Sequence, residues 1–252
     1  DQSFMKILIF FKKLFRFISH ITNTKKIISD IGDFKVCANE AQSEKIRLWF
    51  KKILDIIEIK TVIRGKIKKG NYLIISNHSS WLDIIILGST FRTTFLSKIE
   101  VSHWPIIGKI TTAVDMLFIN RGTKNAASLA VDGISAFLKN NRSVTIFPEG
   151  TSSGGQGLLK FKPRLFASCI ETNSPVQCVI IKYPHKDEKI HPSVPFVRGN
   201  SLFLNIIKVL FQNDIVAEVT ISELVISENK DRRSITNECY EIVKNNLENN
   251  AN

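Results

Sequence analysis

The sequence has no long run of uncharged apolar residues, and it is poor in cysteine. No stretch approaches the roughly 18 to 20 uncharged apolar residues that a membrane-spanning helix needs. Its four cysteines form no CxxC pair and have no histidine at zinc-site spacing, which argues against a disulfide scaffold and indicates buried thiols in a reducing compartment. The P-loop pattern G-x-x-x-x-G-K-[ST] is also missing, so we expect no bound nucleotide and no metal.

Apolar residues make up 44% of the 252 residues, enough for one large domain or a domain with a small appendage. Acidic residues are the scarcer charge, and the net charge is +12. The imbalance is concentrated early, because residues 1–70 carry 16 Lys and Arg against 7 Asp and Glu. We therefore expect an anionic partner, such as a membrane surface, nucleic acid or an acidic protein.

Two early segments have the pattern of amphipathic helices. In "FMKILIFFKKLFRFIS", four cations fall within about 120° of helical arc and leave the remaining surface to Phe, Ile and Leu. This pattern is typical of a helix in a bilayer interface, and a core-packing helix is the alternative. "EKIRLWFKKILDIIEI" repeats it, so the two helices would form a hairpin docked on anionic lipid. The four cations are Lys6, Lys12, Lys13 and Arg16.

From residue 72 onward, short apolar strands alternate with helical patterns. This alternation predicts an α/β fold with a mixed, largely parallel sheet flanked by helices, preceded by the amphipathic helical pair. We expect a membrane-surface region at 1–62 and an α/β domain at 63–252. The predicted strands are 72–76, 94–98, 116–119, 143–147, 176–182 and 215–226, and the predicted helices are 83–90, 105–114, 124–139, 163–172, 201–210 and 234–247.

The stretch "NHSSWLD" follows the first of these strands and holds a histidine and an acid five residues apart. Residues five apart on one helix point about 140° away from each other, so His78 and Asp83 would meet only if the chain turns between them. "NHSS" supplies turn and N-cap residues. A carboxylate that holds imidazole Nδ1–H leaves Nε2 as a base. The alternative is a polar strand end followed by a capped helix.

Two further polar groups follow predicted strands. "FPEGTSS" places Glu149, Gly150 and Thr151 in a glycine-rich loop, where a carboxylate, backbone N–H groups and a hydroxyl would face a polar ligand. "LFINRG" places Arg121 at a strand end, where a guanidinium suits phosphate or carboxylate. Ligands of α/β sheets bind beyond the carboxyl ends of strands, so these motifs lie where a site would form.

These three motifs, in this order and spacing, resemble the lysophospholipid acyltransferases, the family of bacterial 1-acylglycerol-3-phosphate acyltransferase. They are similar to its NHxxxxD, F-I-x-R and F-P-E-G-T-x-S motifs, and "SPVQCVIIKYP" is a looser match to its fourth motif. The resemblance covers about residues 46–226. It implies transfer of an acyl chain from acyl-CoA or acyl-carrier protein, as co-substrate, to a lysolipid hydroxyl, without another cofactor and without an acyl-enzyme.

The resemblance also implies roles for individual residues. His78 would be the general base and Asp83 its orienting partner in a catalytic pair, while a second group of residues would hold the acceptor's polar head. The acceptor would be 1-acylglycerol-3-phosphate, and the enzyme would lie on the cytoplasmic face of the cell membrane as a peripheral or monotopic protein. The residues implied to bind the head are Arg121, Glu149, Gly150 and Thr151.

One position departs from the family pattern. Many members with a phosphate-bearing acceptor have Arg after the motif's Thr, whereas this chain has Ser152. "FPEGTSSGGQGLLKFKPRLF" is closer to the subgroup that acylates lyso-ornithine lipid, whose head carries no phosphate. Both acceptors therefore stay open. The cations that would replace the missing charge are Lys98, Lys160, Lys162 and Arg164.

Two other classes of function compete with acyl transfer. "GTSSG" matches the G-x-S-x-G pattern of serine hydrolases with Ser152 as nucleophile, although Pro148 and Glu149 separate it from the strand and only Asp187 and His191 follow as triad partners. A non-catalytic basic protein is the second alternative. Its cations lie on apolar helices and not among aromatic stacking platforms, which favours lipid and argues against nucleic acid.

Overall fold

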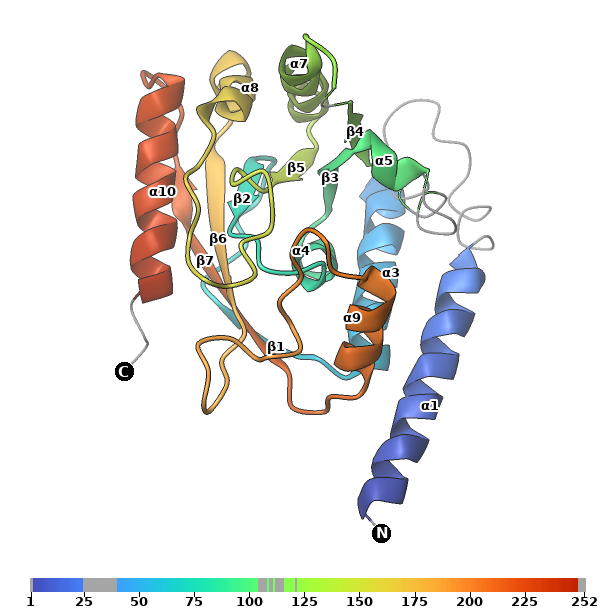
Figure 1. The fold of residues 1–252 in the computed structure, drawn as a ribbon. Helices are drawn as coiled ribbons and strands as arrows, with labels where there is room; N and C mark the ends of the chain where they lie inside the picture. The colour runs from blue at the N-terminus through green and yellow to red at the C-terminus, as the bar shows by residue number, and fades with distance from the viewer. Residues whose placement is uncertain are drawn as a thin grey trace.

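The computed structural model describes residues 2–24, 40–103, 108, 111, 116–120 and 122–248. In this part of the chain a seven-stranded sheet has the order β1-β7-β6-β2-β5-β3-β4 (Figure 1). All neighbours pair in parallel except β6 and β7, which are antiparallel. The strands are β1 (Lys60–Arg64), β2 (Leu73–Ser76), β3 (Thr93–Lys98), β4 (Leu117–Ile119), β5 (Ser143–Ile146), β6 (Val176–Lys182) and β7 (Val216–Val225).

Helices cover both faces of this sheet, because its central strands are apolar on both sides. In β2, Leu73 and Ile75 pack into one buried cluster with α7, α8 and α10, while Ile74 packs into the other with α1, α3, α4 and α9. The mixed, largely parallel α/β fold is confirmed. The helices are α1 (Gln2–Thr22), α3 (Glu40–Ile57), α4 (Leu82–Thr90), α5 (Ile99–Ser102), α7 (Ala126–Lys139), η1 (Pro163–Phe166), α8 (Ala167–Glu171), α9 (Leu202–Leu210) and α10 (Arg232–Glu248).

All six predicted strands are present, and the structure has one further strand, β1, that was not predicted. Helix α3 ends where Glu58 adopts a left-handed conformation with φ of 59°, and the amide of Ile59 donates to Leu54 O. This turn usually carries glycine or asparagine, so a glutamate there is no recognisable stop signal. The expected boundary after residue 62 falls within β1, and the division into two regions stays a prediction. The predicted helix at 105–114 lies largely outside the described residues.

The amphipathic segments both form helices, but α3 does not present its apolar side to the surroundings. Its apolar side chains are buried in the core shared with the sheet, so the expected lipid-docked hairpin of two helices is wrong for α3. Within the described residues, no helix has both the length and the apolar character needed to cross a bilayer. The buried side chains of α3 are Ile46, Trp49, Phe50, Ile53, Leu54, Ile56 and Ile57.

Lys13 also differs from the expectation that it faces lipid headgroups, because it is only 1% exposed and cannot reach them. Its ammonium donates to Gln212 O at 2.8 Å, to Asn213 Oδ1 at 2.7 Å and to Ile57 O at 3.3 Å, and it pairs with Glu58 at 3.0 Å. These acceptors lie at the C-terminal ends of α3 and α9, where the helix dipoles favour a cation. Lys13 therefore fastens α1 to the domain.

Candidate active site

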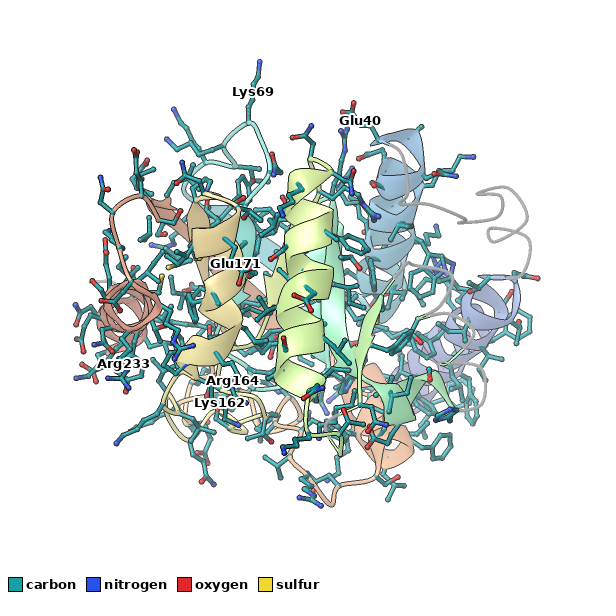
Figure 2. The ribbon with its side chains drawn as sticks, turned by 90° about the horizontal axis from the view of Figure 1, so that it is seen from above. Glu40, Lys69, Lys162, Arg164, Glu171 and Arg233 are labelled. Atoms are coloured by element: carbon teal, nitrogen blue, oxygen red, sulfur yellow. The ribbon has the colours of Figure 1, made fainter. Side chains whose placement is uncertain are left out.

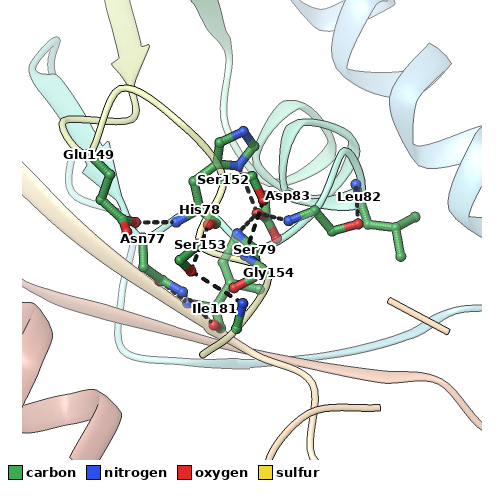
Figure 3. A network of polar contacts seen from close by, with 12 residues as sticks. Asn77, His78, Ser79, Leu82, Asp83, Glu149, Ser152, Ser153, Gly154 and Ile181 are labelled. Atoms are coloured by element: carbon green, nitrogen blue, oxygen red, sulfur yellow. Dashed lines mark hydrogen bonds and ion pairs between the residues drawn. The ribbon is translucent and has the colours of Figure 1, made fainter. Parts of the chain in front are cut away.

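The chain leaves β2 through Asn77, whose side chain pairs with the backbone of the neighbouring strand. Asn77 Nδ2 donates to Ile181 O, and Asn77 Oδ1 accepts from Ile181 N–H, both at 2.9 Å (Figure 3). The amide thus continues the β2–β6 pairing by one residue although the backbone has already begun to turn. This contact fixes the direction in which His78 leaves the sheet.

The turn brings His78 and Asp83 together, as the catalytic interpretation of the motif requires. His78 Nδ1 lies 2.9 Å from Asp83 Oδ2, and Asp83 is fully buried at the start of α4. The same oxygen accepts the amides of Ser79 at 2.7 Å and Ser80 at 2.8 Å. Because an ionised carboxylate only accepts hydrogen bonds, it fixes the tautomer in which Nδ1 carries the proton. The Nε2 atom is left as the acceptor and points away from this network (Figure 3).

Tyr183, which was not among the expected site residues, completes this network. Its hydroxyl donates to Asp83 Oδ1 at 2.6 Å, and the residue is buried. Burial raises the pKa of Tyr183 well above its usual value, so the hydroxyl stays protonated and remains a donor. The available signal was its position directly after β6, which is the neighbour of β2 in the sheet.

The His78 ring is also held from its face. It stacks on Phe147 with centroids 3.9 Å apart and an interplanar angle of 18°. Its side chain is 18% exposed and lines a cavity of about 830 Å³. One ring edge is thus bound to a carboxylate, and the imidazole as a whole borders an open space.

The cavity is mainly apolar and extends from His78 between the helices on that face of the sheet. The apolar part of such a space suits a hydrocarbon chain. Its apolar lining includes Phe17 and Ile21 of α1, Phe50 and Ile53 of α3, Ile84 of α4 and Phe95 of β3.

The structure places only some of the residues that the family resemblance assigns to the acceptor's head beside the cavity. Gly150 and Thr151 line the cavity with His78, and so does Lys98, one of the cations expected to replace the missing arginine. Gly150 has a φ of +74°, and a Cβ there would lie 2.6 Å from Lys162 Nζ, so glycine lets Lys162 lie across the loop. Arg121 lies outside the described residues.

Glu149 is placed differently from the expectation, because it does not border the cavity lining that the structure describes. It is 2% exposed, and its two oxygens accept the amides of His78 at 2.7 Å and Leu159 at 2.9 Å. Burial raises the pKa of Glu149 to about 7, although these two amides act in the opposite direction. The geometry therefore makes Glu149 a residue that positions His78 and keeps its carboxyl group away from an acceptor in the cavity.

We expect Glu149→Gln to change the pH dependence of stability. Between pH 4.5 and about 7 the folded chain keeps a proton on Glu149 that the unfolded chain has released, so this group makes stability fall as pH rises. The unfolding free energy of the parent minus that of the variant should therefore fall by about 3 kcal/mol from about pH 4.5 to about pH 7. Urea unfolding of both proteins at the two pH values measures it, and a difference that stays constant would contradict the expectation.

The hydrolase alternative finds no support in the loop that carries Ser152. No helix follows the serine directly, since the loop runs on to η1 at Pro163. Within the described residues, Ser152 Oγ contacts the amide of Gly154, and no hydrogen bond joins it to His78. His191, the proposed triad histidine, pairs with Asp214 at 3.2 Å and not with Asp187.

His185, His191 and Asp214 form the group of possible metal ligands that the described residues contain. His191 Nδ1 accepts the amide of Ser193 at 3.2 Å, which places the ring proton on Nε2, where it donates to Asp214. Both ring nitrogens of His191 are thus engaged in hydrogen bonds. The hydrogen bonds therefore account for this group without an ion.

Comparisons with known proteins identify the family of this chain. The acyltransferase family model matches residues 57–182. The lyso-ornithine lipid O-acyltransferase of Pseudomonas aeruginosa is 30% identical over 198 residues, 79% of this chain and 76% of that protein. The 1-acyl-sn-glycerol-3-phosphate acyltransferase of Neisseria gonorrhoeae is 34% identical over 111 residues, 44% of each chain.

A solved structure has the same fold. The 1-acyl-sn-glycerophosphate acyltransferase of Thermotoga maritima gives a TM-score of 0.71 at 19% identity and covers 98% of this chain and 97% of its own. The family match contains both His78 and Asp83, together with the Phe147–Ser153 loop. The chain belongs to the acyltransferase family.

Proposed function

We propose that this protein is a membrane-surface enzyme that transfers an acyl chain from a thioester, acyl-CoA or acyl-carrier protein, to the hydroxyl of 1-acylglycerol-3-phosphate, giving phosphatidate. The observation that carries this proposal is a histidine whose Nδ1 is held by a buried carboxylate and whose ring borders an apolar cavity of about 830 Å³. Such a cavity suits the acyl chain, and the free ring nitrogen suits the acceptor's hydroxyl.

The reaction needs one proton to be taken up and returned. His78 Nε2 removes the proton from the acceptor's hydroxyl as the oxygen attacks the thioester carbonyl. The new C–O bond forms, the C–S bond breaks, and the imidazolium returns the proton to the leaving thiolate. Asp83 stabilises the imidazolium between these steps, and no covalent acyl-enzyme is required.

Cations at the cavity support a phosphate-bearing acceptor. Five exposed basic side chains line it, and no Asp or Glu is among the described residues of its lining. No salt bridge within the described part of the chain uses any of the five. Figure 2 shows two of them, Lys162 and Arg164, close together. The five are Lys98, Lys124, Lys162, Arg164 and Arg198.

We expect Lys162→Gln to raise the KM for lysophosphatidate about tenfold, because hydrogen bonds between charged groups contribute roughly 1.5 to 3 kcal/mol. Lys160→Gln is the matched control, since Lys160 is also exposed and lies outside the described cavity lining. Steady-state kinetics with varied acceptor measures both. Equal KM values for the two variants would remove Lys162 from phosphate binding.

Lyso-ornithine lipid is the second candidate acceptor, favoured by the Pseudomonas relative and by Ser152 at the position of the missing arginine. Its head group pairs a carboxylate with an amine and so carries less negative charge than a phosphate. The deciding experiment supplies labelled acyl-CoA with each acceptor in parallel. Diacylated product from lysophosphatidate supports the proposal, and product from lyso-ornithine lipid alone would replace it.

A further inference from the structure

The exposed side of α1 is apolar although the helix packs against the domain. Six apolar side chains point outward within about 100° of helical arc. Phe15, at 74% exposed, is the most open of them. Lys12 and Arg16 lie beyond one edge of this arc, while Phe10 and Phe17 on another side pack into the core. The outward residues are Phe4, Ile7, Leu8, Phe11, Phe15 and Ile18.

Helix α9 adds a second apolar surface that no sequence pattern had assigned to lipid. Phe203 is 68% exposed and Leu204 is 59% exposed, and Lys208 on the same helix is exposed as well. Ser201 caps the start of the helix by accepting the amide of Leu204. These side chains therefore project from a capped helix and not from an irregular loop.

The two surfaces are joined. Helices α1 and α9 run close to each other in Figure 1, and Phe10 of α1 stacks on Phe211 after α9 with centroids 3.8 Å apart and an interplanar angle of 9°. Lys13 fixes the same junction by donating to Gln212 O. The two helices therefore meet at Phe10 and Phe211, and the latter is itself 45% exposed.

The cavity beside His78 is lined by other residues of the same two helices. Its lining includes Phe17 and Ile21 of α1 and Leu202 and Ile206 of α9. Adjacent turns of each helix thus contribute side chains both to the cavity and to the outer surface.

We propose that α9 is the second lipid-contacting element of this protein. In this proposal, the α1–α9 surface, defined as the six outward residues of α1 with Phe203, Leu204 and Phe211, lies on an anionic bilayer and admits the acceptor's chain between the two helices. A bilayer is the occupant because the surface is apolar at its centre and carries Lys12, Arg16 and Lys208 beside it, which suits acyl chains bordered by anionic headgroups. The entry route rests on the proposed function.

The test is a double substitution, Phe203→Ser with Leu204→Ser, whose two sites are exposed and whose folding cost is therefore small. Binding to vesicles of phosphatidylethanolamine and phosphatidylglycerol should weaken at least about tenfold, because two large apolar side chains no longer enter the interface. Leu129→Ser on α7 is the matched control, since Leu129 is 64% exposed. Vesicle flotation measures all three proteins. Equal binding of parent and double variant, or an equal loss in Leu129→Ser, would overturn the proposal.

A second measurement does not depend on loss of binding. In Phe203→Trp, the additional indole should be quenched by vesicles containing brominated lipid, whereas the additional indole of Leu129→Trp should not, each relative to the parent. If vesicle-bound Phe203→Trp showed no more quenching than the vesicle-bound parent, contact between α9 and the bilayer would be contradicted.

Activity separates this inference from the proposed function. On a short-chain lysophosphatidate dissolved as monomers, parent and double variant should turn over equally, and on the acceptor in vesicles the double variant should be about tenfold slower. Equal rates on vesicles would overturn the α9 surface alone. Absence of acyl transfer by the parent on either acceptor would overturn the proposed function, while the vesicle-binding result would still decide the surface.

Discussion

Replacing His78 by alanine should lower the rate of acyl transfer by about 10² to 10⁴, which is the typical contribution of a general base. The variant should still fold, because Asp83 keeps three donors without the imidazole: the amides of Ser79 and Ser80 and the hydroxyl of Tyr183. Its buried carboxylate is thus not left without partners. Initial rates with labelled acyl-CoA, together with urea unfolding, measure activity and stability in the same preparation.

The control for this prediction is His185→Ala. His185 is partly exposed and lies outside the described lining of the cavity, so its loss should leave the rate near that of the parent. Near-normal turnover by a folded His78→Ala variant would refute the general-base assignment. Loss of activity in Ser152→Ala with an unaffected His78→Ala would instead restore the hydrolase alternative.

Asp83→Asn should have an effect of similar size, about 10² to 10⁴ in rate, because the imidazolium formed in the reaction would lose its negative partner. The substitution fits the site. The amide oxygen can accept from the backbone of Ser79 and Ser80, and the amide nitrogen can face the oxygen of Tyr183. The rate loss would therefore come from the lost charge and not from unfolding, which rates and urea unfolding measured side by side can separate.

Tyr183→Phe is the companion variant for Asp83, since it removes one donor from the carboxylate and keeps the charge. Its rate should fall far less than that of Asp83→Asn. A carboxylate with one donor fewer favours the imidazolium more strongly, so the acid limb of the kcat/KM profile should move to higher pH. Equal losses in the two variants, with no shift of the acid limb, would mean that Asp83 acts through its packing and not through its charge.

Sequence patterns located most elements of this fold, because the spacing of apolar residues and the presence of turn residues are local signals. The strand at 176–182 was predicted with the bounds that the structure has, and α4 was predicted to within one residue. Strand β1 was missed because Glu58 makes the preceding turn without glycine. In the candidate site, too, local features could be inferred from the sequence and long-range contacts could not. The turn between His78 and Asp83 could be inferred from the residues between them, whereas the buried place of Glu149 depends on an amide 71 residues away.

The order of the motifs, the presence of two amphipathic helices, and the need for a turn between an imidazole and a carboxylate could all be inferred from the chain alone. What covers each apolar face depended on the three-dimensional arrangement: the apolar side of α3 is buried in the core with α4 and the sheet, whereas six apolar side chains of α1 stay exposed. That arrangement also brought Tyr183 to Asp83 across 100 residues, and buried Lys13 between two helix ends. Periodicity states which side of a helix is apolar, but partners distant in sequence depend on the order in which strands pair.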